Sequence, residues 1–413
     1  MIRPRTLPLG PLQPDLAAIL NASGLRAANN VLPTKSGYEP MLALADIGEN
    51  AITLRPRGGI SGTDRANNPW NYVGQADKIY EIASSGTRDA SKVGGYSCTG
   101  TERWAFAEFG TVVIATSFND PLQYIDTAAP LGTYADVPEL SPGVGVPRGR
   151  RIGVVENHVI LGDCYDAVYG AVPDSIWWGA IKQPLSYPEI NSDLAASLQS
   201  DRQPLRGEGG PVQAVIGGAE VGAIFQERAI WRMDYRGGAT IFELTRVVPD
   251  MGLLVPELAV AFPRGVFFLA EDGFYVFDYN AATPIGKDRM NQAFLDDYDR
   301  DYPDRVWAID DPDSTRIWVV YPGAGNSSGR PNKALVWDWA LDLFTTGEFD
   351  MEMPAHILPG GITLDTLPDD NLDTFEPTTS FDARQSAAGV HGDGQHARHR
   401  IGNVRQAGGI YQA

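Results

Sequence analysis

Short apolar runs alternate with short polar turns along most of this chain, most clearly in residues 207–286. Two pairs of runs there are each separated by a few turn residues: Ala223–Phe225 with Ala229–Met233, and Val266–Leu269 with Phe274–Phe277. Each pair predicts a β-hairpin, and no helical spacing occurs between them. Asp272-Gly273 predicts the tight turn of the second hairpin, because glycine takes a positive φ without steric cost.

The same pattern recurs before and after this stretch. Further hairpins are predicted for Tyr72-Val73 with Lys78–Ile82, Trp104–Glu108 with Thr111–Thr116, Arg151–Val155 with His158–Leu161, and Val306–Ile309 with Arg316–Tyr321, followed by a strand at Leu335–Trp339. One strand per unit, centred on Val113, Ile160, Ile224, Phe267 and Trp318, recurs after 47, 64, 43 and 51 residues. A repeat of about 45 residues is typical of a β-propeller blade. The longest step contains Trp177-Trp178-Gly179 and the polar run Pro184–Arg206, which we interpret as an inserted loop.

We therefore predict an all-β chain, a β-propeller of short antiparallel hairpins with six or seven blades and extended N- and C-terminal arms. The expected boundaries are an N-terminal arm over 1–41, a propeller over 42–358 and a polar C-terminal arm over 359–413. Six hairpin units lie between Leu42 and Phe349. A seventh would form if the N-terminal segment paired with the segment around Ala355–Leu367, which would protect the sheet edges. A stacked β-sandwich remains the alternative.

The two ends differ in character from the repeats. Residues 1–40 are rich in proline, but Leu7, Leu9, Leu12, Leu16, Ile19 and Leu20 indicate an arm that lies on another surface, with one or two helical turns at Asp15–Leu20. The last 25 residues hold three of the five histidines and few large apolar groups. We expect them to need a partner in order to become ordered.

Composition narrows the possible functions. The net charge of −19 argues against a protein that coats DNA by neutralising phosphates, although an acidic wall past which DNA slides is compatible with it. The two cysteines, Cys98 and Cys164, do not form a disulfide framework and fit folding in a reducing cytosol. Prolines interrupt the N-terminal apolar residues and no apolar run approaches about 18 residues, so we expect neither a signal peptide nor a membrane span.

Motifs for catalysis are weak. Gly95–Gly100 resembles a nucleophile elbow around Ser97 and Cys98, but it is one residue too long, and we favour a strand end. P-loop, HExxH and CxxC motifs do not occur. We predict no catalytic residue, cofactor or metal, and a chain that is not an enzyme.

Three groups of charged or metal-binding side chains remain as candidates. Asp297, Asp299 and Asp301 have the spacing that begins a calcium loop, but Tyr302 replaces its glycine and Ala308 its glutamate, so a solvated acidic loop is favoured; cation binding at 296–304 stays open. His391, His396 and His399 could bind a metal, although incidental histidines are favoured. Arg148, Arg150 and Arg151 could meet phosphate or an acidic neighbour, and we expect them to face water.

Several short motifs, in their order along the chain, suggest a family. They are Leu9-Gly10-Pro11, Asn29–Pro33, Gly37–Pro40, Tyr72–Gly74, Trp104–Phe106, Pro121–Asp126, Ile224–Ile230, Tyr235–Gly238, Asp272–Tyr275, Pro284–Gly286, Gly361–Asp365 and Ser380–Arg384. With them the chain resembles the packaged-DNA stabilisation and tail accessory proteins of short-tailed bacteriophages, which include tail nozzle and hub proteins. The resemblance covers most of residues 9–385, and its specificity lies in the order of the motifs.

The resemblance implies a structural virion protein, made in the host bacterial cytoplasm and placed in the phage tail. It implies a β-propeller subunit in a homohexameric ring next to the connector or portal-side adaptor and other tail proteins. That ring would line or seal the DNA channel and retain DNA until ejection, passing it without sequence-specific binding and without contact to a membrane. Two alternatives remain: a β-propeller that binds or hydrolyses glycans, and a receptor-binding protein at the tail tip. A connector position in a long-tailed phage also stays open.

Overall fold

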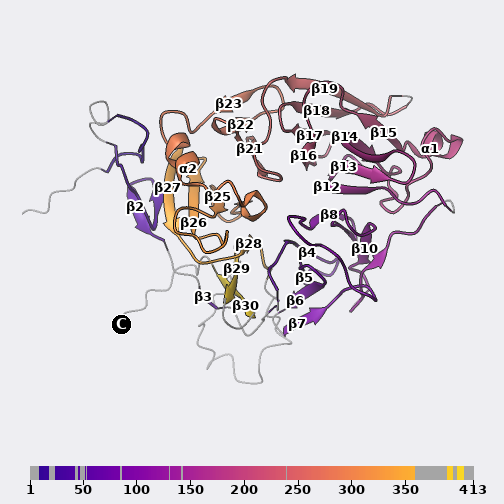
Figure 1. Ribbon diagram of the computed structural model, residues 1–413, viewed down its shortest axis with the longest axis horizontal. Helices are drawn as coiled ribbons and strands as arrows, with labels where there is room; N and C mark the ends of the chain where they lie inside the picture. The colour runs from indigo at the N-terminus through magenta and orange to yellow at the C-terminus, as the bar shows by residue number, and fades with distance from the viewer. Residues whose placement is uncertain are drawn as a thin grey trace, which may run out of the picture.

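The strands of this protein form a ring of small antiparallel sheets around a central axis (Figure 1). The computed structural model describes residues 9–17, 24–41, 52, 54–83, 86–129, 131–140, 143–238 and 240–358, together with the backbone of 45–46, 388–393 and 398–403. In this part of the chain there are two short α-helices, α1 (Asp193–Leu198) and α2 (Asn291–Asp297), and one 3-10 turn, η1 (Pro303–Arg305). Neither helix is long and apolar enough to span a membrane.

Six of the four-stranded sheets are made of strands that follow one another in the chain. They are β4 (Gly58–Thr63), β5 (Pro69–Gly74), β6 (Ile79–Ala83) and β7 (Gly86–Asp89); β8 (Ala105–Phe109), β9 (Val112–Thr116), β10 (Gln123–Asp126) and β11 (Ala135–Asp136); β12 (Arg148–Val155), β13 (His158–Asp166), β14 (Gly170–Trp178) and β15 (Asp201–Pro204); β16 (Val212–Ile216), β17 (Val221–Gln226), β18 (Ile230–Tyr235) and β19 (Phe242–Val248); β20 (Ala259–Phe262), β21 (Gly265–Ala270), β22 (Gly273–Phe277) and β23 (Ala282–Pro284); and β24 (Trp307–Asp310), β25 (Arg316–Tyr321), β26 (Lys333–Asp338) and β27 (Leu343–Glu348). These sheets are propeller blades, which confirms the predicted all-β propeller.

The first strand of each blade lies next to the axis and contacts the first strand of the next blade. The strand centres chosen from the spacing (Val113, Ile160, Ile224, Phe267 and Trp318) all fall in second strands, namely β9, β13, β17, β21 and β25. The repeat seen in the sequence is thus the blade repeat. The stretch 207–286 contains two complete blades, β16–β19 and β20–β23.

A seventh four-stranded sheet joins the two ends of the chain. It consists of β28 (Met353–Ala355), β29 (Ala388–Asp393), β30 (Arg398–Asn403) and β3 (Ala45–Asp46), in that order. Because β28 contacts both β24 and β4, this sheet closes the ring.

Closure of the ring by both chain ends matches the prediction, but the partner strand differs. Strand β3 pairs with β30, whereas Ala355, the start of the predicted partner segment Ala355–Leu367, pairs with Ala388 of β29; residues 359–367 of that segment lie outside the described part. The innermost position is occupied by β28, so the N-terminal strand is added at the outer edge. Part of the predicted polar C-terminal arm therefore belongs to the ring.

Stacking of the blades explains why the second strands read as continuous apolar runs. All six residues of β25 are buried, whereas both residues of the outermost strand β11 are exposed. Neighbouring blades cover both faces of the inner strands, so an alternating pattern would leave polar side chains in the core. Aromatic rings fill this space: Phe225 lies 5.2 Å from Phe268, and Phe267 lies 5.6 Å from Trp337 between ring centroids.

The turn between β21 and β22 differs from its prediction by one residue. Ala270 pairs with Gly273, so the two turn residues are Glu271 and Asp272 rather than Asp272-Gly273. Gly273 has a φ of 138°, and a Cβ atom there would lie 1.8 Å from the side chain of Asn291. The glycine is therefore required by close packing at the start of β22, as well as by its backbone angle.

The long step between the third and fourth units is only partly an inserted loop. The tryptophan pair ends β14, and Asp201–Pro204 is the outer strand β15 of the same blade. The true insertion, residues 179–200, carries the helix α1. Its N-terminus is capped by the Ser192 side chain, which accepts a hydrogen bond from the backbone of Ala195.

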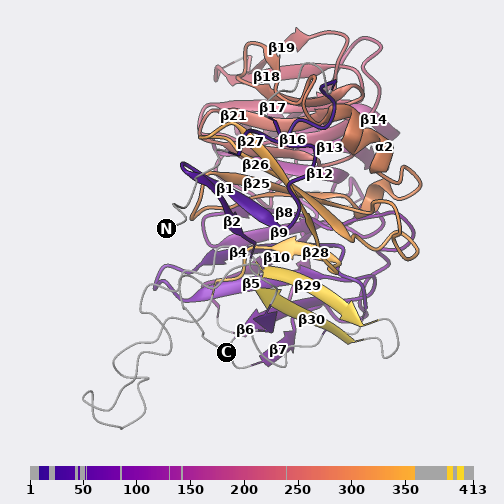
Figure 2. The same ribbon diagram turned by 90° about the vertical axis from the view of Figure 1, so that its left-hand side faces the viewer.

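The described part of the N-terminal arm lies against two neighbouring blades. Its hairpin, β1 (Val31–Thr34) and β2 (Gly37–Pro40), contacts β27, where Asn29 forms a parallel bridge with Thr346 (Figure 2). Leu12 is buried in the large core cluster around β20–β27. The arm thus covers the outer edge of the blade β24–β27.

Asp15 ties the same arm to the helix α2. Its carboxylate accepts hydrogen bonds of 2.9 Å from the backbone N–H groups of Gln292 and Ala293. The helix has no side-chain cap of its own, so a residue distant in sequence takes that role. The predicted helical turns at Asp15–Leu20 are not found in the described residues, where Pro14–Leu16 form a turn; residues 18–20 lie outside them.

Candidate functional site

The axis of the ring holds a cavity of about 560 Å³. Residues from the first strands of all seven sheets line it. Much of the wall is aliphatic, with Ile152, Val215 and Val260 among its side chains. Charged side chains come from positions near the two ends of the lining strands. Because the cavity collects residues from every blade, it is the natural candidate for a binding site in this fold.

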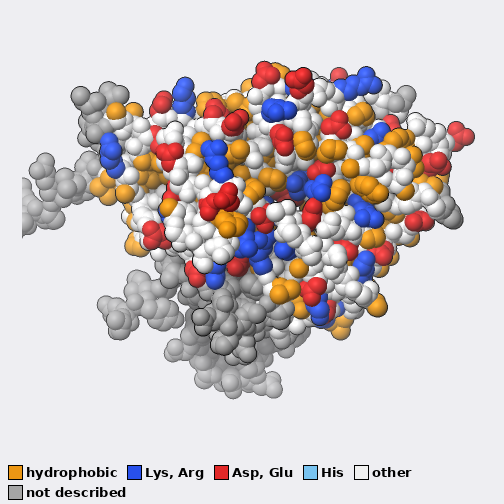
Figure 3. All heavy atoms as spheres, viewed as in Figure 1, with side chains coloured by type: hydrophobic (Ala, Val, Ile, Leu, Met, Phe, Trp, Pro, Cys, Tyr) orange, Lys and Arg blue, Asp and Glu red, His pale blue; other side chains and the backbone are white. Residues whose placement is uncertain are grey.

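Charged residues gather at the end of the cavity where the lining strands begin. In neighbouring blades the beginnings of the first strands lie side by side. The backbone N–H of Trp104 donates to the Arg57 carbonyl, and that of Glu257 donates to the Gln213 carbonyl. Residues one or two positions before these strands, together with Arg151 within β12, therefore meet at one end. We call the set Arg57, Arg103, Arg151, Glu257, Arg305 and Glu352 the charged end. Figure 3 shows Lys and Arg side chains gathered near the middle of the ring face.

At the centre of the charged end, two arginines share one carboxylate. Arg151 Nη1 lies 3.2 Å from Glu257 Oε1, and Arg103 Nε lies 3.6 Å from Glu257 Oε2. The Arg103 guanidinium also stacks on Trp307, with 3.5 Å between Cζ and the ring centroid, and it donates to the carbonyl of Val306. Side chains from four blades thus meet at this point.

Both arginines are buried, since Arg103 is 7% and Arg151 8% exposed. Burial lowers the pKa of Arg103 to about 10, with the attraction of Glu257 opposing it. The Arg151 Nε atom is buried without a hydrogen-bond partner in the described part of the chain, whereas the Arg103 Nε atom makes no hydrogen bond there but faces Glu257 Oε2 at 3.6 Å. This cluster carries one positive charge more than Glu257 compensates, together with unused donors.

Further ion pairs surround this centre. Arg55 lies 2.8 Å from Asp304, and Arg305 lies 3.5 Å from Glu352. Arg57 donates to the backbone carbonyls of Gly100 and Glu102. Burial lowers the pKa of both Arg57 and Arg305, and the neighbouring Arg55 adds to the lowering. The carboxylates here are thus engaged by arginines from other sheets of the ring.

The opposite end of the cavity has a different composition. His356 Nε2 lies 3.4 Å from Asp310 Oδ1; His356 directly follows β28, and Asp310 is the last residue of β24. The Ser61 hydroxyl donates to the His356 backbone carbonyl. A carboxylate here makes this end unfavourable for an anion, so the two ends differ in their electrostatic character.

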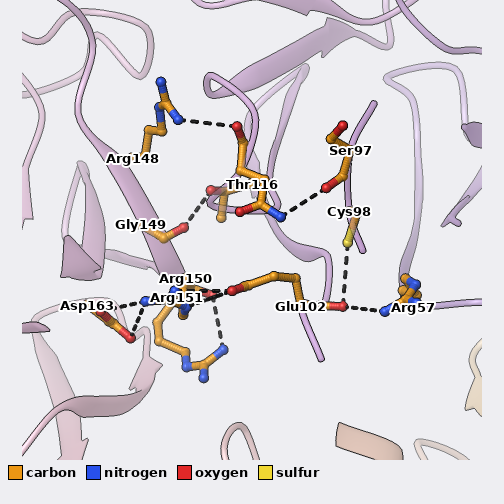
Figure 4. Close-up of polar contacts among 11 residues, drawn as sticks. Arg57, Ser97, Cys98, Glu102, Thr116, Arg148, Gly149, Arg150, Arg151 and Asp163 are labelled. Atoms are coloured by element: carbon orange, nitrogen blue, oxygen red, sulfur yellow. Dashed lines mark hydrogen bonds and ion pairs between the residues drawn. The ribbon is translucent and has the colours of Figure 1, made fainter. Parts of the chain in front are cut away.

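The three arginines singled out in the sequence do not all face water, so that expectation is wrong for two of them. Arg151 belongs to the charged end. Arg150 lies between Glu102 and Asp163, at 3.1 Å from each carboxylate (Figure 4). Its guanidinium also stacks on Phe118. Arg148 donates to the Asn119 carbonyl at the surface. Adjacent strand residues point to opposite faces, which separates Arg150 from Arg151.

Arg150 and its partners form a second buried charge cluster, of opposite balance. Burial lowers the pKa of Arg150, but hydrogen bonds to Glu102 and the attraction of Asp163 outweigh it and raise that pKa overall. Burial raises the pKa of Asp163 even though Arg150 pulls it down. One guanidinium here serves two carboxylates.

Ser97 and Cys98 are packed into a loop between blades. The Cys98 thiol is buried and lies 3.5 Å from the Glu102 carbonyl (Figure 4). Burial raises the pKa of Cys98 to about 12, so the thiol stays protonated at neutral pH and is a poor nucleophile. The Ser97 backbone bonds to Asp120 and Asn119. Ser97 and Cys98 both lie in the loop between β7, which ends at Asp89, and β8, which begins at Ala105, so the strand-end interpretation is wrong.

The acidic triplet is used within the fold. Asp297 accepts from Lys333 at 2.6 Å and from Tyr321 at 3.0 Å, whereas Asp299 accepts from Asn326. Asp301 donates its backbone N–H to Asp299. In the residues that the structure describes, no three His, Cys, Asp or Glu side chains lie together as a metal site would need.

The histidine candidates fall largely outside the described side chains. His391 and His399 lie in β29 and β30, which pair with each other, and only their backbone is described; His396 lies outside the described residues.

Sequence reasoning missed Arg103, Glu257 and Trp307. A usable signal existed, because charged residues stand one or two residues before the first strands of five sheets. Arg57 and Glu352 directly precede β4 and β28, whereas Arg103, Glu257 and Arg305 stand two residues before β8, β20 and β24. Since first strands run alike around a propeller axis, such residues meet at one end of the channel. Recognising this requires knowing which hairpin strand is innermost.

The fold and the channel define a β-propeller. No family model matches the chain, and no curated protein matches it. Similar solved structures include the computationally designed protein Ika8 (9% identity, 92% of this chain and 97% of that chain, TM-score 0.43) and a chain of the mitotic checkpoint complex (9%, 91% and 100%, TM-score 0.46). The β-propeller domain of Cps50 (Swd1) from Myceliophteria thermophila is similar at 8% identity, over 85% of this chain and 98% of that chain, with a TM-score of 0.46. These likenesses carry no argument about function, and the propeller class rests on the sheet topology.

Proposed function

We propose that this chain is a structural subunit of a bacteriophage tail, in which six copies form a ring at the nozzle, hub or head-to-tail connection. The ring lines or seals the DNA channel and retains the DNA until ejection. In this proposal the protein is made in the host cytoplasm, resides in the virion and has no catalytic role. Its partners are the connector or portal-side adaptor and other tail proteins.

The observation that carries the structural role is the state of the carboxylates around the propeller channel. Glu257, Asp304 and Glu352 are each held by an arginine from another part of the ring. Such pairs connect blades, and they leave these acids unavailable as proton donors or nucleophiles. The net charge of −19 supports the conduit role, because an acidic surface does not retain passing DNA. The ordered motifs described above supply the link to phage tails.

A glycan-binding or glycan-hydrolysing propeller is the second candidate, and one observation favours it. The cavity places Trp307 beside two arginines and a glutamate, a combination that can bind an acidic sugar. Hydrolysis, however, needs a pair of carboxylates on either side of the glycosidic bond. Glu257 is engaged by Arg151, and Asp310 lies at the other end of the cavity beside His356.

Negative-stain electron microscopy and mass measurement of the purified chain test the tail-ring proposal. We expect six-fold rings whose abundance rises with protein concentration. A chain that stays monomeric at its highest soluble concentration, and that shows no affinity for a connector ring, overturns the proposal. Hydrolysis of an acidic oligosaccharide by the purified chain would instead establish the second candidate.

A DNA-binding assay tests the proposed conduit role independently of ring formation. An acidic conduit should leave duplex DNA unretarded in a gel even at low salt. Strong binding that weakens steeply as salt is added would contradict a wall past which DNA slides. A basic control protein of similar size in the same gel shows that retardation is detectable.

A further inference from the structure

The centre of the charged end, formed by Arg103, Arg151 and Glu257, contains more positive charge than Glu257 balances. Arg103 and Arg151 flank Glu257 on two sides, at 3.6 Å and 3.2 Å, so one positive charge is left over. Arg150, by contrast, is supplied with two carboxylates, those of Glu102 and Asp163. A surplus cation in a buried position is costly unless an anion compensates it.

Donors for an anion are present at the same point. The Nε atom of Arg151 is buried and has no hydrogen-bond partner in the part of the chain that the structure describes, and that of Arg103 has only a long ion pair of 3.6 Å to Glu257. The lowered pKa of Arg103, caused by burial, agrees with a cation that is incompletely compensated. Guanidinium groups present paired N–H donors whose geometry suits carboxylate and phosphate oxygens.

The cavity beside these donors has the size and lining of a ligand site. Its volume of about 560 Å³ falls in the usual range of small-molecule pockets, about 300–1,000 Å³. Ile152, Val215 and Val260 give it an aliphatic wall, and Asp310 at the far end repels an anion. A ligand with one acidic group and an apolar body would therefore lie with its acid at the charged end.

We infer that the channel binds a small organic acid, whose carboxylate or phosphate group is held by Arg103 and Arg151 and whose apolar body lies along the aliphatic wall. The two arginines bind and orient the acid, and no covalent bond is formed or broken. Because the cavity lies within one chain, this inference goes beyond the proposed tail ring and does not depend on it.

Isothermal titration calorimetry of the full chain at low salt tests the inference with phenyl phosphate, benzoate and uncharged benzyl alcohol. We expect one saturable site per chain for at least one of the two acids and none for benzyl alcohol. Preference between the acids identifies the head group. The absence of saturable binding for both acids, or equal binding of benzyl alcohol, overturns the inference.

Two variants with opposite expected effects separate binding from general damage to the fold. Arg151→Gln removes the surplus charge and should weaken acid binding about tenfold or more, because a charge-assisted hydrogen bond is lost. Glu257→Gln increases the surplus and should tighten binding several-fold. Loss of structure cannot produce tighter binding, so a weaker or unchanged affinity of Glu257→Gln contradicts the inference.

The exposed pair Arg236 and Glu243 offers matched controls. These side chains are 54% and 52% exposed and form an ion pair of 2.7 Å away from the channel. Arg236→Gln and Glu243→Gln make the same changes of net charge as the two channel variants. Their affinity for the acid should stay within about twofold of the unchanged protein. A similar shift in both pairs of variants would show that overall charge, and not the channel, governs binding.

Discussion

Two adjacent arginines on β12 occupy opposite electrostatic situations. Arg150 points toward the neighbouring blade, where one guanidinium meets the carboxylates of Glu102 and Asp163. Arg151 points toward the channel, where it shares Glu257 with Arg103. The first cluster has a surplus of negative charge and the second a surplus of positive charge.

The difference shows that two adjacent residues of one strand can have different roles, one in holding blades together and the other in binding a ligand. A guanidinium placed between two buried carboxylates holds blades together, because removing it would leave two like charges facing each other. A carboxylate placed between two guanidiniums leaves donors unused. The first arrangement is complete within the protein, whereas the second would be completed by an anion.

The largest expected effect is the loss of Arg150. Arg150→Met should lower the free energy of unfolding at neutral pH by about 2 kcal/mol, because Glu102 and Asp163 remain partly buried without their partner. We place the value below that of a fully buried pair because the Arg150 side chain is 30% exposed and solvent screens it. Urea denaturation followed by tryptophan fluorescence measures the change.

Arg151→Met provides the comparison for that measurement. Glu257 keeps Arg103 when Arg151 is removed, so we expect a smaller loss, about 1 kcal/mol or less. The repulsion between the two arginines is also relieved. If Arg151→Met proves more destabilising than Arg150→Met, the assignment of the two charge balances is wrong.

The contrast between these clusters also separates what the sequence can predict from what it cannot. Trp104–Glu108 and Val266–Leu269 are local apolar runs bounded by turns, and local patterning was sufficient to place them in hairpins. The blade repeat followed from their spacing. The pairing of β3 with β30 could not be predicted, because it joins segments from opposite ends of the chain and neither has a strong pattern of its own.

The site was harder to predict than the fold for a related reason. Glu257 becomes important only because β8, β12 and β24 bring Arg103, Arg151 and Trp307 to it. No local motif contains that information. Similarly, a run of arginines before a strand looks solvent-exposed until the neighbouring blade is in place. Charges one or two residues before the first strands of several blades are the feature that sequence reasoning can use in other propellers.

A smaller effect is expected from pH, through Asp163. Burial raises its pKa in the folded state above the ordinary value of 3.8. Folding therefore gains from Asp163 below that value, and the gain is lost as the pH rises through the folded pKa. Asp163→Asn removes this dependence, so its stability relative to the unchanged protein should rise as the pH increases from below 4 toward neutrality.

Urea denaturation of both proteins at several pH values between about 4 and 7 measures this difference. The midpoint and the slope of each curve together give the free energy of unfolding at that pH. Asp278→Asn serves as the contrast, because hydrogen bonds from the Ala281 and Asn280 backbone lower the pKa of Asp278. Its relative stability should change in the opposite direction, falling as the pH rises. A relative stability of Asp163→Asn that falls with pH would show that Arg150 dominates over burial.

The smallest effect is expected at the exposed pair Arg236 and Glu243. A double-mutant cycle with Arg236→Gln and Glu243→Gln should give a coupling energy of about 0.5 kcal/mol or less, since water screens both groups. The corresponding cycle of Arg150→Met with Asp163→Asn should give a clearly larger value, because these side chains are 30% and 10% exposed. Equal couplings in the two cycles would mean that the Arg150 cluster is as well solvated as a surface pair. The distinction between the two faces of β12 would then lose its physical basis, because it depends on charges that the blades remove from water.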